Sequence, residues 1–463
     1  MKKAKNTMGG EERKAAVSLA GIFALRMLGL FLILPVFSVY AHGLEGAKAH
    51  PELVGIALGA YGLTQALLQI PFGMLSDRFG RKPVIAIGML LFAIGSVVAA
   101  TSTTIEGVLV GRVLQGSGAV AAAIIALVAD LTSEENRTKA MAMIGMTIGI
   151  SFAISMVLGP MLGHWIGVAG IFWLTAALAL FSILFLYAVV PTPKRLVHHR
   201  DSELTPDRVM GVLKDANLLR LDFGIFALHA ALTGLFVVLP LVLVDPGHIL
   251  LKAPHQWMLY LPVMLVSFVL MVPLIIVAEA KRKMKQIFTS GVAMLVIAVM
   301  LLAVSHHSLA WIAVALLIFF TGFNVLEASL PSLVSKYAHA GAKGTAIGVY
   351  NTCEFFGAFV GGVLGGLLYV PSLGNYATVF WAIAGLLAVW LLVAATMAQP
   401  RYVATRIFHV GAVDEARSKE LQERFMAVNG VAEVAIFADE EAAYCKVDSK
   451  VVDDDELKAV VGA

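Results

Sequence analysis

The chain has 463 residues, of which 59% are hydrophobic and 14% are charged, and its formal net charge is +3. Soluble domains carry about a quarter of charged residues, so this composition and a mean hydropathy of +0.86 exclude a soluble globular protein. The small net charge gives no indication of a nucleic-acid partner.

Long apolar segments dominate the chain. About twenty apolar residues cross a bilayer as a helix, and on that measure the sequence predicts an all-α membrane protein with twelve transmembrane helices. The polar start, Met1–Lys14, and the length of the first apolar run argue against a cleavable signal peptide. The predicted spans cover residues 16–41, 53–76, 83–101, 106–130, 139–163, 168–190, 221–244, 257–279, 286–304, 309–335, 343–369 and 376–397.

Basic residues are concentrated in every second loop. Seventeen Lys and Arg residues lie in one set of loops, whereas the opposite set contains only Lys48 and Lys252. Because basic loops stay on the cytoplasmic side, we expect a multi-pass membrane protein with both termini in the cytoplasm. The seventeen residues are Arg78, Arg81, Lys82, Arg137, Lys139, Lys194, Arg195, Arg200, Arg208, Lys214, Arg220, Lys281, Arg282, Lys283, Lys285, Lys336 and Lys343.

A polar, Pro-containing stretch divides the spans into two groups of six. It predicts an N-terminal six-helix bundle over residues 1–190, a cytoplasmic linker over 191–220 and a C-terminal six-helix bundle over 221–399. The groups repeat, because Gly29–Pro35 recurs as Gly234–Pro240, 205 positions later. Duplicated halves of this kind place a substrate path at their interface. A second match, offset by 203, pairs Gly145, Gly159 and Gly163 with Gly348, Gly362 and Gly366.

The turn after the second span is unusually rich in charge and glycine. It reads Gly73-Met-Leu-Ser-Asp77-Arg78-Phe-Gly80-Arg81-Lys82. Asp77 follows an apolar helix, so its carboxylate lies at the negative end of the helix dipole and needs a partner. Gly73 and Gly80 permit a close backbone approach and a chain reversal. An ordinary basic loop is the alternative interpretation.

This turn resembles motif A, G-x-L-(A/S)-D-R-x-G-R-K, of the major facilitator superfamily of secondary transporters. The resemblance implies that Arg81 pairs with Asp130 at the end of the fourth span, and that Asp77 faces the start of the eleventh span at 343–345. These contacts are expected to latch the two halves together when the transporter opens outward. A static, solvated salt bridge is the alternative. The latch residues are Gly73, Asp77, Arg78, Gly80, Arg81, Lys82 and Asp130.

Two arginines lie inside predicted spans, where a charge is costly unless it has a partner or faces water. Arg112 belongs to Leu109-Val-Gly-Arg-Val-Leu-Gln-Gly116, which resembles motif B of the superfamily, and the resemblance implies a role in proton coupling. A structural hub that binds backbone carbonyls is the alternative. Arg26 lies in the first span, and its repeat counterpart is Ala231.

The fifth span contains Gly159-Pro160-x-x-Gly163, which resembles motif C, a pattern associated with antiporters in the superfamily. Physically, the glycines let this helix pack closely on another, and Pro160 bends it. His164 stands where a second glycine is usual. Close packing without any meaning for the direction of transport is the alternative.

Two carboxylates lie deep in the second half, Glu327 in the tenth span and Glu354 in the eleventh. A Glu in a membrane interior can exchange between neutral and charged forms, so it is a natural proton carrier. The resemblance places the first, fourth, seventh and tenth spans around a cavity, which favours Arg26, Arg112 and Glu327 as its lining. A permanently protonated structural Glu is the alternative for both acids, and His229 in the seventh span is a weaker candidate.

The last sixty residues differ in composition from the rest. Residues 403–410 alternate as a strand, 413–428 has helical spacing, and 431–437 and 442–447 predict a hairpin. Asp453 is placed to cap a final helix. The βαββα order resembles the ferredoxin-like fold of heavy-metal-associated domains and predicts a small cytoplasmic α+β domain over residues 403–463. Their metal-binding C-x-x-C is absent, so no metal is expected there.

Twelve spans followed by this tail resemble the YajR-type branch of the drug:proton antiporters. The resemblance implies a proton-coupled multidrug exporter of the bacterial inner membrane that works by alternating access. Its expected substrates are small organic or amphipathic compounds, and its partners are the substrate, protons and the lipid bilayer. An exporter of a sugar or metabolite, and a transporter-like sensor that signals through the tail to an unknown partner, are the alternatives. No nucleophile–base pattern, phosphate loop or metal-ligand cluster indicates an enzyme, and neither a cofactor nor a metal is expected.

Overall fold

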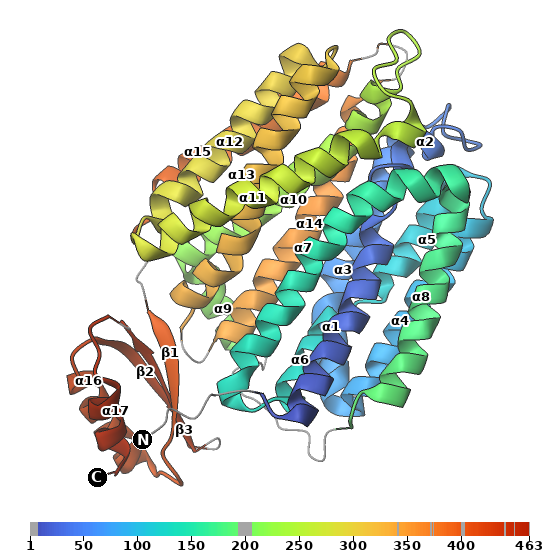
Figure 1. The fold of residues 1–463 in the computed structure, drawn as a ribbon. Coiled ribbons are helices and arrows are strands. Elements are labelled where there is room, and N and C mark those ends of the chain that lie inside the picture. The colour runs from blue at the N-terminus through green and yellow to red at the C-terminus, as the bar shows by residue number, and fades with distance from the viewer. Residues whose placement is uncertain are drawn as a thin grey trace.

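The computed structural model describes residues 8–192, 206–339, 342–370, 373, 375–399, 403–438, 441–448 and 450–462. Twelve helices in this part of the chain are long and apolar enough to cross a membrane, which confirms the predicted all-α membrane architecture. Figure 1 shows the helices of the first half packed beside those of the second half, with a small domain at one end. Most of the predicted linker, residues 193–205, lies outside the described residues.

The first half comprises eight helices that form six spans. They are α1 (Gly10–Phe31), α2 (Phe37–Ala41), α3 (Glu52–Phe79), α4 (Arg81–Thr101), α5 (Ile105–Ser117), α6 (Ala121–Leu131), α7 (Glu134–Trp165) and α8 (Gly167–Val189). We call the end of the molecule with the turns at Gly80, 281–283 and 338–342 the basic end. The start of α1 also lies there, because Glu12 accepts hydrogen bonds from Ser133 and Asn136 beside the start of α7.

The second half follows the same order. It comprises α9 (Pro206–Lys214), α10 (Ala216–Leu243), the 3₁₀ turn η2 (Ala253–His255), α11 (Trp257–Ala280), α12 (Met284–Ser305), α13 (Leu309–Tyr337), α14 (Lys343–Leu368) and α15 (Tyr376–Ala395). The predicted linker is therefore partly helical, and the seventh span begins five residues earlier than expected, at Ala216. Asp215 fixes this start, because its side chain accepts hydrogen bonds from the N–H groups of Asn217 and Leu218.

Two spans that were predicted as continuous helices are interrupted. The first breaks between Phe31 and Phe37, where Pro35 has no N–H to donate and short turn bonds replace the helical ones. The fourth breaks between Ser117 and Ala121. There Gly118 lies so close to α4 that a Cβ atom would be 2.3 Å from the carbonyl oxygen of Gly88. In both places local backbone chemistry overrides the continuous apolar pattern.

The two halves touch through glycine-lined helices away from the basic end. A Cβ atom on Gly55 of α3 would lie 2.3 Å from the carbonyl oxygen of Gly362 on α14, and one on Gly62 would lie 2.4 Å from that of Phe355. Ser38 of α2 also donates a hydrogen bond of 3.0 Å to the carbonyl of Phe236 on α10. On α3 these contacts lie in the first part of the helix, and on α14 they lie between its middle and its end. They therefore join the halves away from the basic end.

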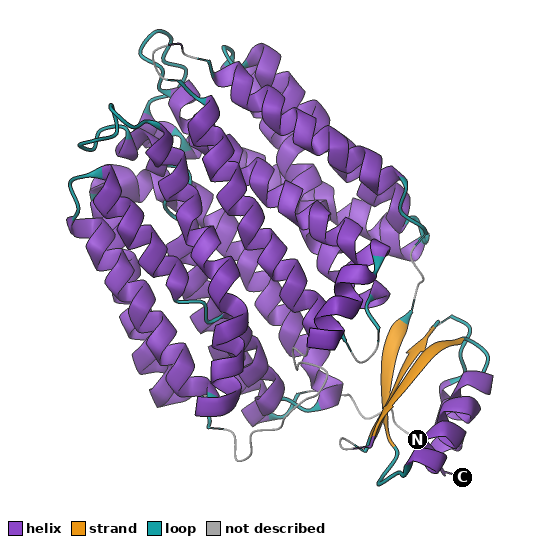
Figure 2. Cartoon of the chain, turned by 180° about the vertical axis from the view of Figure 1, so that it is seen from behind, coloured by secondary structure: helices purple, strands orange, loops and turns teal. Residues whose placement is uncertain are grey.

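The C-terminal domain has the predicted βαββα order. Its elements are β1 (Ala404–His409), α16 (Glu415–Ala427), β2 (Val431–Phe437), β3 (Ala442–Val447) and α17 (Asp454–Gly462), and the antiparallel sheet has the order β1-β3-β2. Figure 2 shows both helices on one face of the sheet. Leu421, Phe425, Cys445 and Leu457 form the core beneath them.

The other face of this sheet contacts the second half of the membrane region. Side chains alternate across a strand, so Lys446 points away from the core that contains Cys445. Lys446 is 4% exposed, pairs with Glu433 at 3.1 Å and donates to the backbone carbonyls of Lys336 and Ala338. The Arg282 guanidinium holds both oxygens of Asp448, at 2.7 and 2.9 Å. The domain therefore docks on the turns that precede α12 and α14.

Candidate functional site

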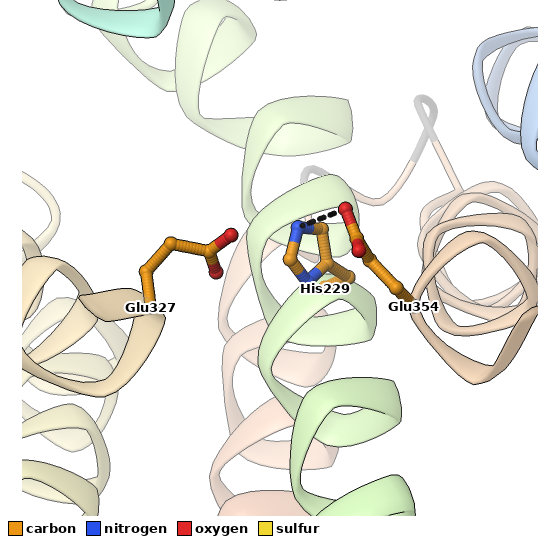
Figure 3. A group of neighbouring side chains, drawn as sticks. All are labelled: His229, Glu327 and Glu354. Atoms are coloured by element: carbon orange, nitrogen blue, oxygen red, sulfur yellow. Dashed lines mark ion pairs between the residues drawn. The ribbon is translucent and has the colours of Figure 1, made fainter. Parts of the chain in front are cut away.

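Three ionisable side chains from three helices converge in the second half of the membrane region. They are His229 on α10, Glu327 on α13 and Glu354 on α14, and one nitrogen or oxygen atom of each lies within 4.8 Å of the others. His229 Nε2 and Glu354 Oε1 form an ion pair at 3.5 Å. Figure 3 shows the imidazole between the two carboxylates, which reach it from opposite sides. We call these three residues the central cluster.

Glycines bring the helices of the central cluster together. A Cβ atom on Gly357 would lie 2.2 Å from the carbonyl oxygen of Phe226, and one on Gly361 would lie 2.1 Å from that of Ala230. Helix α14 can therefore lie directly on α10, which places Glu354 beside His229. On α13, Asn324 donates a hydrogen bond of 3.1 Å to Ser267 of α11, one turn before Glu327.

The central cluster has few hydrogen-bond partners among the residues that the structure describes. Glu327 Oε2, His229 Nδ1 and the hydroxyl of Tyr350 are buried atoms without a side-chain or ion-pair partner there. The side chains of His229 and Glu354 are still 11% and 20% exposed, so the site is not sealed. A buried polar group without a partner costs free energy, and such groups often serve a functional role.

Arg26 lies across the interface between the halves from this cluster. It is 1% exposed and donates hydrogen bonds of 2.7 Å to the Tyr61 hydroxyl and of 2.7 Å to Gln65 Oε1. The Tyr61 ring packs on Phe355, with 6.3 Å between ring centroids, next to Glu354. Arg26 is therefore held on α3, with Tyr61 and Phe355 between it and Glu354 in the chain of contacts.

The structure does not bring Arg112 into the central cluster. Arg112 donates to Gln115 Oε1 at 2.9 Å and to the Leu58 carbonyl at 3.3 Å, and its guanidinium lies 5.2 Å from the centre of the Tyr61 ring. These contacts connect α5 with α3 within the first half. They correspond to the hydrogen-bond hub that the sequence offered as the alternative for this residue.

The charged turn at the basic end forms a compact network. Arg81 is 5% exposed, and its Nε lies 2.9 Å from Oδ2 of Asp130, as expected from the sequence. Arg81 also pairs with Asp77 and donates 2.8 Å to Ser76 Oγ. Gly80 has φ of +94°, which favours glycine, and it lets the chain reverse between α3 and α4.

Asp77 itself is engaged within this turn rather than at the start of α14. Its side chain is 41% exposed and its ion pair is with Arg81, four residues away. Arg78 lies over the Phe79 ring at 5.4 Å, and Lys82 donates to the Val190 carbonyl at 2.5 Å. At Gly73, a Cβ atom would meet Ala122 at an ordinary 3.5 Å. The predicted contact of Asp77 with the second half is absent from this conformation, as far as described residues show.

The glycines of the fifth span fit the break in the first. A Cβ atom on Gly159 would lie 2.5 Å from the Leu32 carbonyl oxygen, and one on Gly163 would lie 3.3 Å from Val36. Pro160 and His164 line a cavity of about 350 Å³ formed with α2 and η2. Helix α7 therefore packs on the irregular turn between α1 and α2.

Sequence reasoning gave too little weight to two residues of α10. His229 was the weaker candidate, yet it stands between the two carboxylates. Asp222 falls at the start of the predicted seventh span, 221–244, where an acid is ordinarily solvated, but it is 4% exposed and its Oδ2 has no partner among the described residues. The two residues are seven apart and share one face of the helix. That spacing was available in the sequence, whereas the approach of α13 and α14 was not.

Comparisons with known proteins agree with this architecture. Residues 19–362 match the profile of the Major Facilitator Superfamily, and residues 413–462 match that of the YajR YAM domain. The chain belongs to the Major Facilitator Superfamily. It is 46% identical over 450 residues to the inner membrane transport protein YajR of Escherichia coli K12, covering 97% of both chains. It is 33% identical to an uncharacterized transporter of Buchnera aphidicola, covering 76% of this chain and 89% of that protein.

More distant relatives share part of the chain or only the fold. The class H tetracycline resistance protein of Pasteurella multocida is 29% identical over 155 residues, which is 33% of this chain and 38% of that protein. The crystal structure of a human organic anion transporter matches with a TM-score of 0.60 and 21% identity, covering 83% of this chain and all of that one. A D-xylose–proton symporter matches with a TM-score of 0.66 and 14% identity, covering 84% and 97%.

Proposed function

We propose that this transporter exports small organic or amphipathic compounds across the bacterial inner membrane in exchange for protons, by alternating access. The central cluster carries the proposal, because two carboxylates and an imidazole converge inside the second half, and Glu354 is followed by Phe355, whose carbonyl meets Gly62 of the first half. The name of the Escherichia coli relative supports the inner membrane, and the tetracycline resistance relatives support efflux.

In this mechanism Glu327 and Glu354 carry the protons. An unpaired carboxylate in a membrane interior gains stability by binding a proton, and it can release that proton when the surroundings become wetter or a cation approaches. Proton binding with the site open outward and release with it open inward couple uptake of protons to export. His229 lies 3.5 Å from Glu354 and receives or passes the proton between them.

The charged turn at the basic end acts as the latch of the cycle. In the present conformation the halves are joined by Gly55 and Gly62 of α3 toward the opposite end, and Asp77 stays within its own turn. When the basic end closes, Asp77 reaches the first N–H groups of α14, where the helix dipole favours a carboxylate. The ion pair between Arg81 and Asp130 holds the turn in one conformation throughout the transport cycle.

The basic end is the cytoplasmic end in this proposal. The seventeen Lys and Arg residues of its loops support that orientation, and both termini then lie in the cytoplasm. Gly159, Pro160 and Gly163 support exchange over import through their resemblance to the antiporter motif. Their packing on Leu32 and Val36 gives a physical role at the outer end, where α7 and the broken first span must move together.

A sensor is the second candidate, and the docked C-terminal domain is the observation that favours it. Lys446 and Asp448 hold the domain on the turns that lead into α12 and α14, so a movement of α14 can reach the domain. A sensor binds its ligand without moving it and loses function when residues 403–463 are removed. An exporter of a sugar or metabolite shows flux but accepts a narrower set of compounds.

Proteoliposomes with a trapped pH dye distinguish these functions. Cationic, neutral and anionic compounds are added in turn, and substrate-driven proton movement is recorded for the wild type, Glu327→Gln and a chain shortened to residue 399. We expect movement that is lost in Glu327→Gln and retained by the shortened chain. Glu279→Gln is the matched control, because this acid pairs with Lys336 at the membrane surface. Ligand binding without proton movement contradicts the exporter and supports the sensor.

A further inference from the structure

The central cluster has the composition of a metal centre as well as that of a proton site. One imidazole nitrogen and one oxygen from each of two carboxylates lie within 4.8 Å of one another, and they come from α10, α13 and α14. Two ligands bound to one ion at about 2.1 Å are at most about 4.2 Å apart, so side-chain shifts on the order of 1 Å assemble the site. Imidazole with carboxylate is a ligand set that suits Zn²⁺, Co²⁺ and related ions.

The side chains around the central cluster leave its nitrogen and oxygen atoms available to bind a metal ion. In the described part of the chain Glu327 Oε2 is a buried atom without a partner, and the ion pair of Glu354 is with His229, itself a member of the cluster. The Tyr350 side chain is 3% exposed, its hydroxyl has no partner there, and it lies one turn before Glu354 on α14.

Charge also favours a divalent cation. Two carboxylates match the charge of one M²⁺ ion, and an ion held by them avoids the cost of unpaired charge in a membrane interior. The buried Arg26 is held by Tyr61 and Gln65 on the other half of the molecule. It therefore does not occupy the position between Glu327 and Glu354.

We infer that the central cluster binds one divalent transition-metal ion through His229, Glu327 and Glu354, and that such an ion is a cargo of the transporter. The cargo role rests on the transport activity proposed above, whereas binding does not. The ion enters from the basic end along α10. Asp222 lies two turns before His229, about 10.5 Å along the helix axis, and its unpartnered oxygen offers an intermediate contact.

Binding is tested on the purified, full-length protein in nanodiscs, prepared with a histidine-free affinity tag and stripped of metal with a chelator. Co²⁺ is the first probe, because its visible absorption reports the ligand geometry, and Zn²⁺ then displaces it in a calorimeter. We expect one ion per chain. The affinity should fall at least about tenfold in His229→Ala and in Glu327→Gln, because losing even an outer-shell partner of a metal ligand typically costs that much. Glu279→Gln, a surface acid, should bind like the wild type.

Each outcome decides one part of the inference. A folded wild type that binds neither Co²⁺ nor Zn²⁺, or variants that bind as well as the wild type, overturns the metal site. Size-exclusion profiles and thermal midpoints show that the variants are folded. Binding through Cys353 or Cys445 is tested by a variant with both replaced by serine, and retention of binding in that variant supports the cluster.

Transport of the ion is measured in proteoliposomes with a trapped Zn²⁺-sensitive dye. Entry of Zn²⁺ that is lost in His229→Ala supports the cargo role. Stoichiometric binding without entry overturns the cargo role and leaves the site. Substrate-driven proton movement by an organic compound, with no metal binding, leaves the proposed exporter intact and overturns only the metal inference. Metal binding without any proton movement driven by an organic compound supports the metal site and contradicts the proposed exporter of organic compounds.

Discussion

The two halves of the molecule share one order of helices, yet their charged side chains lie in different places. In the first half the ion pair Arg81–Asp130 lies in the turn between two spans at the basic end. In the second half the acidic groups lie inside the membrane region, in the central cluster. The turn after α11 keeps basic residues but has lost the Gly-x-x-x-Asp pattern. One half thus holds the proposed latch and the other holds the proposed binding site.

The contact between His229 and Glu354 has a neutral counterpart in the first half. At the repeat offsets of 205 and 203, His229 corresponds to Ala24 and Glu354 corresponds to Ser151. Ser151 Oγ donates a hydrogen bond of 3.2 Å to the Ala24 carbonyl, so the same two helices of each repeat meet at the same place. The corresponding helices therefore meet in both halves, but the ionisable pair His229 and Glu354 lies at this contact only in the second half.

Two similar seven-residue sequences also adopt different backbone conformations in the two halves. Gly29–Pro35 includes the break between α1 and α2, whereas Gly234–Pro240 continues as helix α10 to Leu243. Around the first copy, Gly159 of α7 presses on the Leu32 carbonyl. Around the second, Ser38 donates to the carbonyl of Phe236, and residues 227–243 are all buried. Packing, rather than the seven-residue pattern, decides whether the helix continues.

The largest expected effect is a loss of stability, which distinguishes a structural ion pair from the charged groups of the proposed proton site. Arg81→Ala leaves Asp130, whose side chain is 1% exposed, without its partner, and breaking such a pair costs about 3–5 kcal/mol. Glu327→Gln removes a carboxylate that has no such partner, so it should not lower stability. Thermal unfolding in detergent measures both, with Arg78→Ala as the exposed control. An equal loss in Arg81→Ala and Glu327→Gln would contradict this distinction.

A second prediction concerns the surface where the halves meet. In Gly55→Leu the new side chain collides with the backbone of α14, where a Cβ atom would lie 2.3 Å from the Gly362 carbonyl oxygen. The halves should separate at this end. The labelling rate of a cysteine introduced at the buried Val54 should then rise about tenfold, which corresponds to a shift of ~1.4 kcal/mol.

The background for that measurement has Cys353 and Cys445 replaced, so only the new thiol reacts. Gly145→Leu is the matched control, because no atom lies within 4 Å of a Cβ there. Unchanged labelling in Gly55→Leu would show that α3 and α14 do not hold this end closed.

The C-terminal domain adds to the difference between the two halves of the membrane region. Its described polar contacts with that region are with the second half. Lys446→Ala removes the ammonium that donates to the carbonyls of Lys336 and Ala338. We expect limited proteolysis to release the domain several times faster than from the wild type. Lys458→Ala is the control, since Lys458 pairs only with Asp455 within α17 among the described residues. Equal release from both variants would mean that Lys446 does not hold the domain.

The smallest expected effect is a dependence of this docking on pH. The Lys450 backbone N–H and the Arg282 guanidinium hold the pKa of Asp448 below its ordinary value of 3.8. The Lys450 N–H lies in the same domain and keeps its hydrogen bond after undocking, so only the interaction with Arg282 is lost. The part of the lowered pKa that comes from Arg282 favours docking above the ordinary value, and this contribution disappears as the pH falls through the lowered pKa. Proteolytic release, measured with an acid-stable protease, should therefore accelerate below about pH 4, and Asp448→Asn should remove this dependence.

The fold was largely predictable from the sequence, because apolar length, basic loops and strand alternation are local signals. All twelve spans and the strands at 431–437 and 442–447 followed from them. The breaks at Leu32–Val36 and Gly118–Val120 did not, since each depends on a glycine or proline meeting a distant backbone. The sequence named Glu327 and Glu354 but could not place His229 between them, because that requires knowing how α13 and α14 lie against α10.

Proton movement in two matched variants tests the central claim most directly. Glu354→Gln and Ser151→Ala alter corresponding positions of the two halves, each beside the partner helix of its own repeat. In proteoliposomes with a trapped pH dye, substrate-driven proton movement should be lost in Glu354→Gln and retained in Ser151→Ala. Retention in Glu354→Gln, or an equal loss in both variants, would contradict a proton site in the second half.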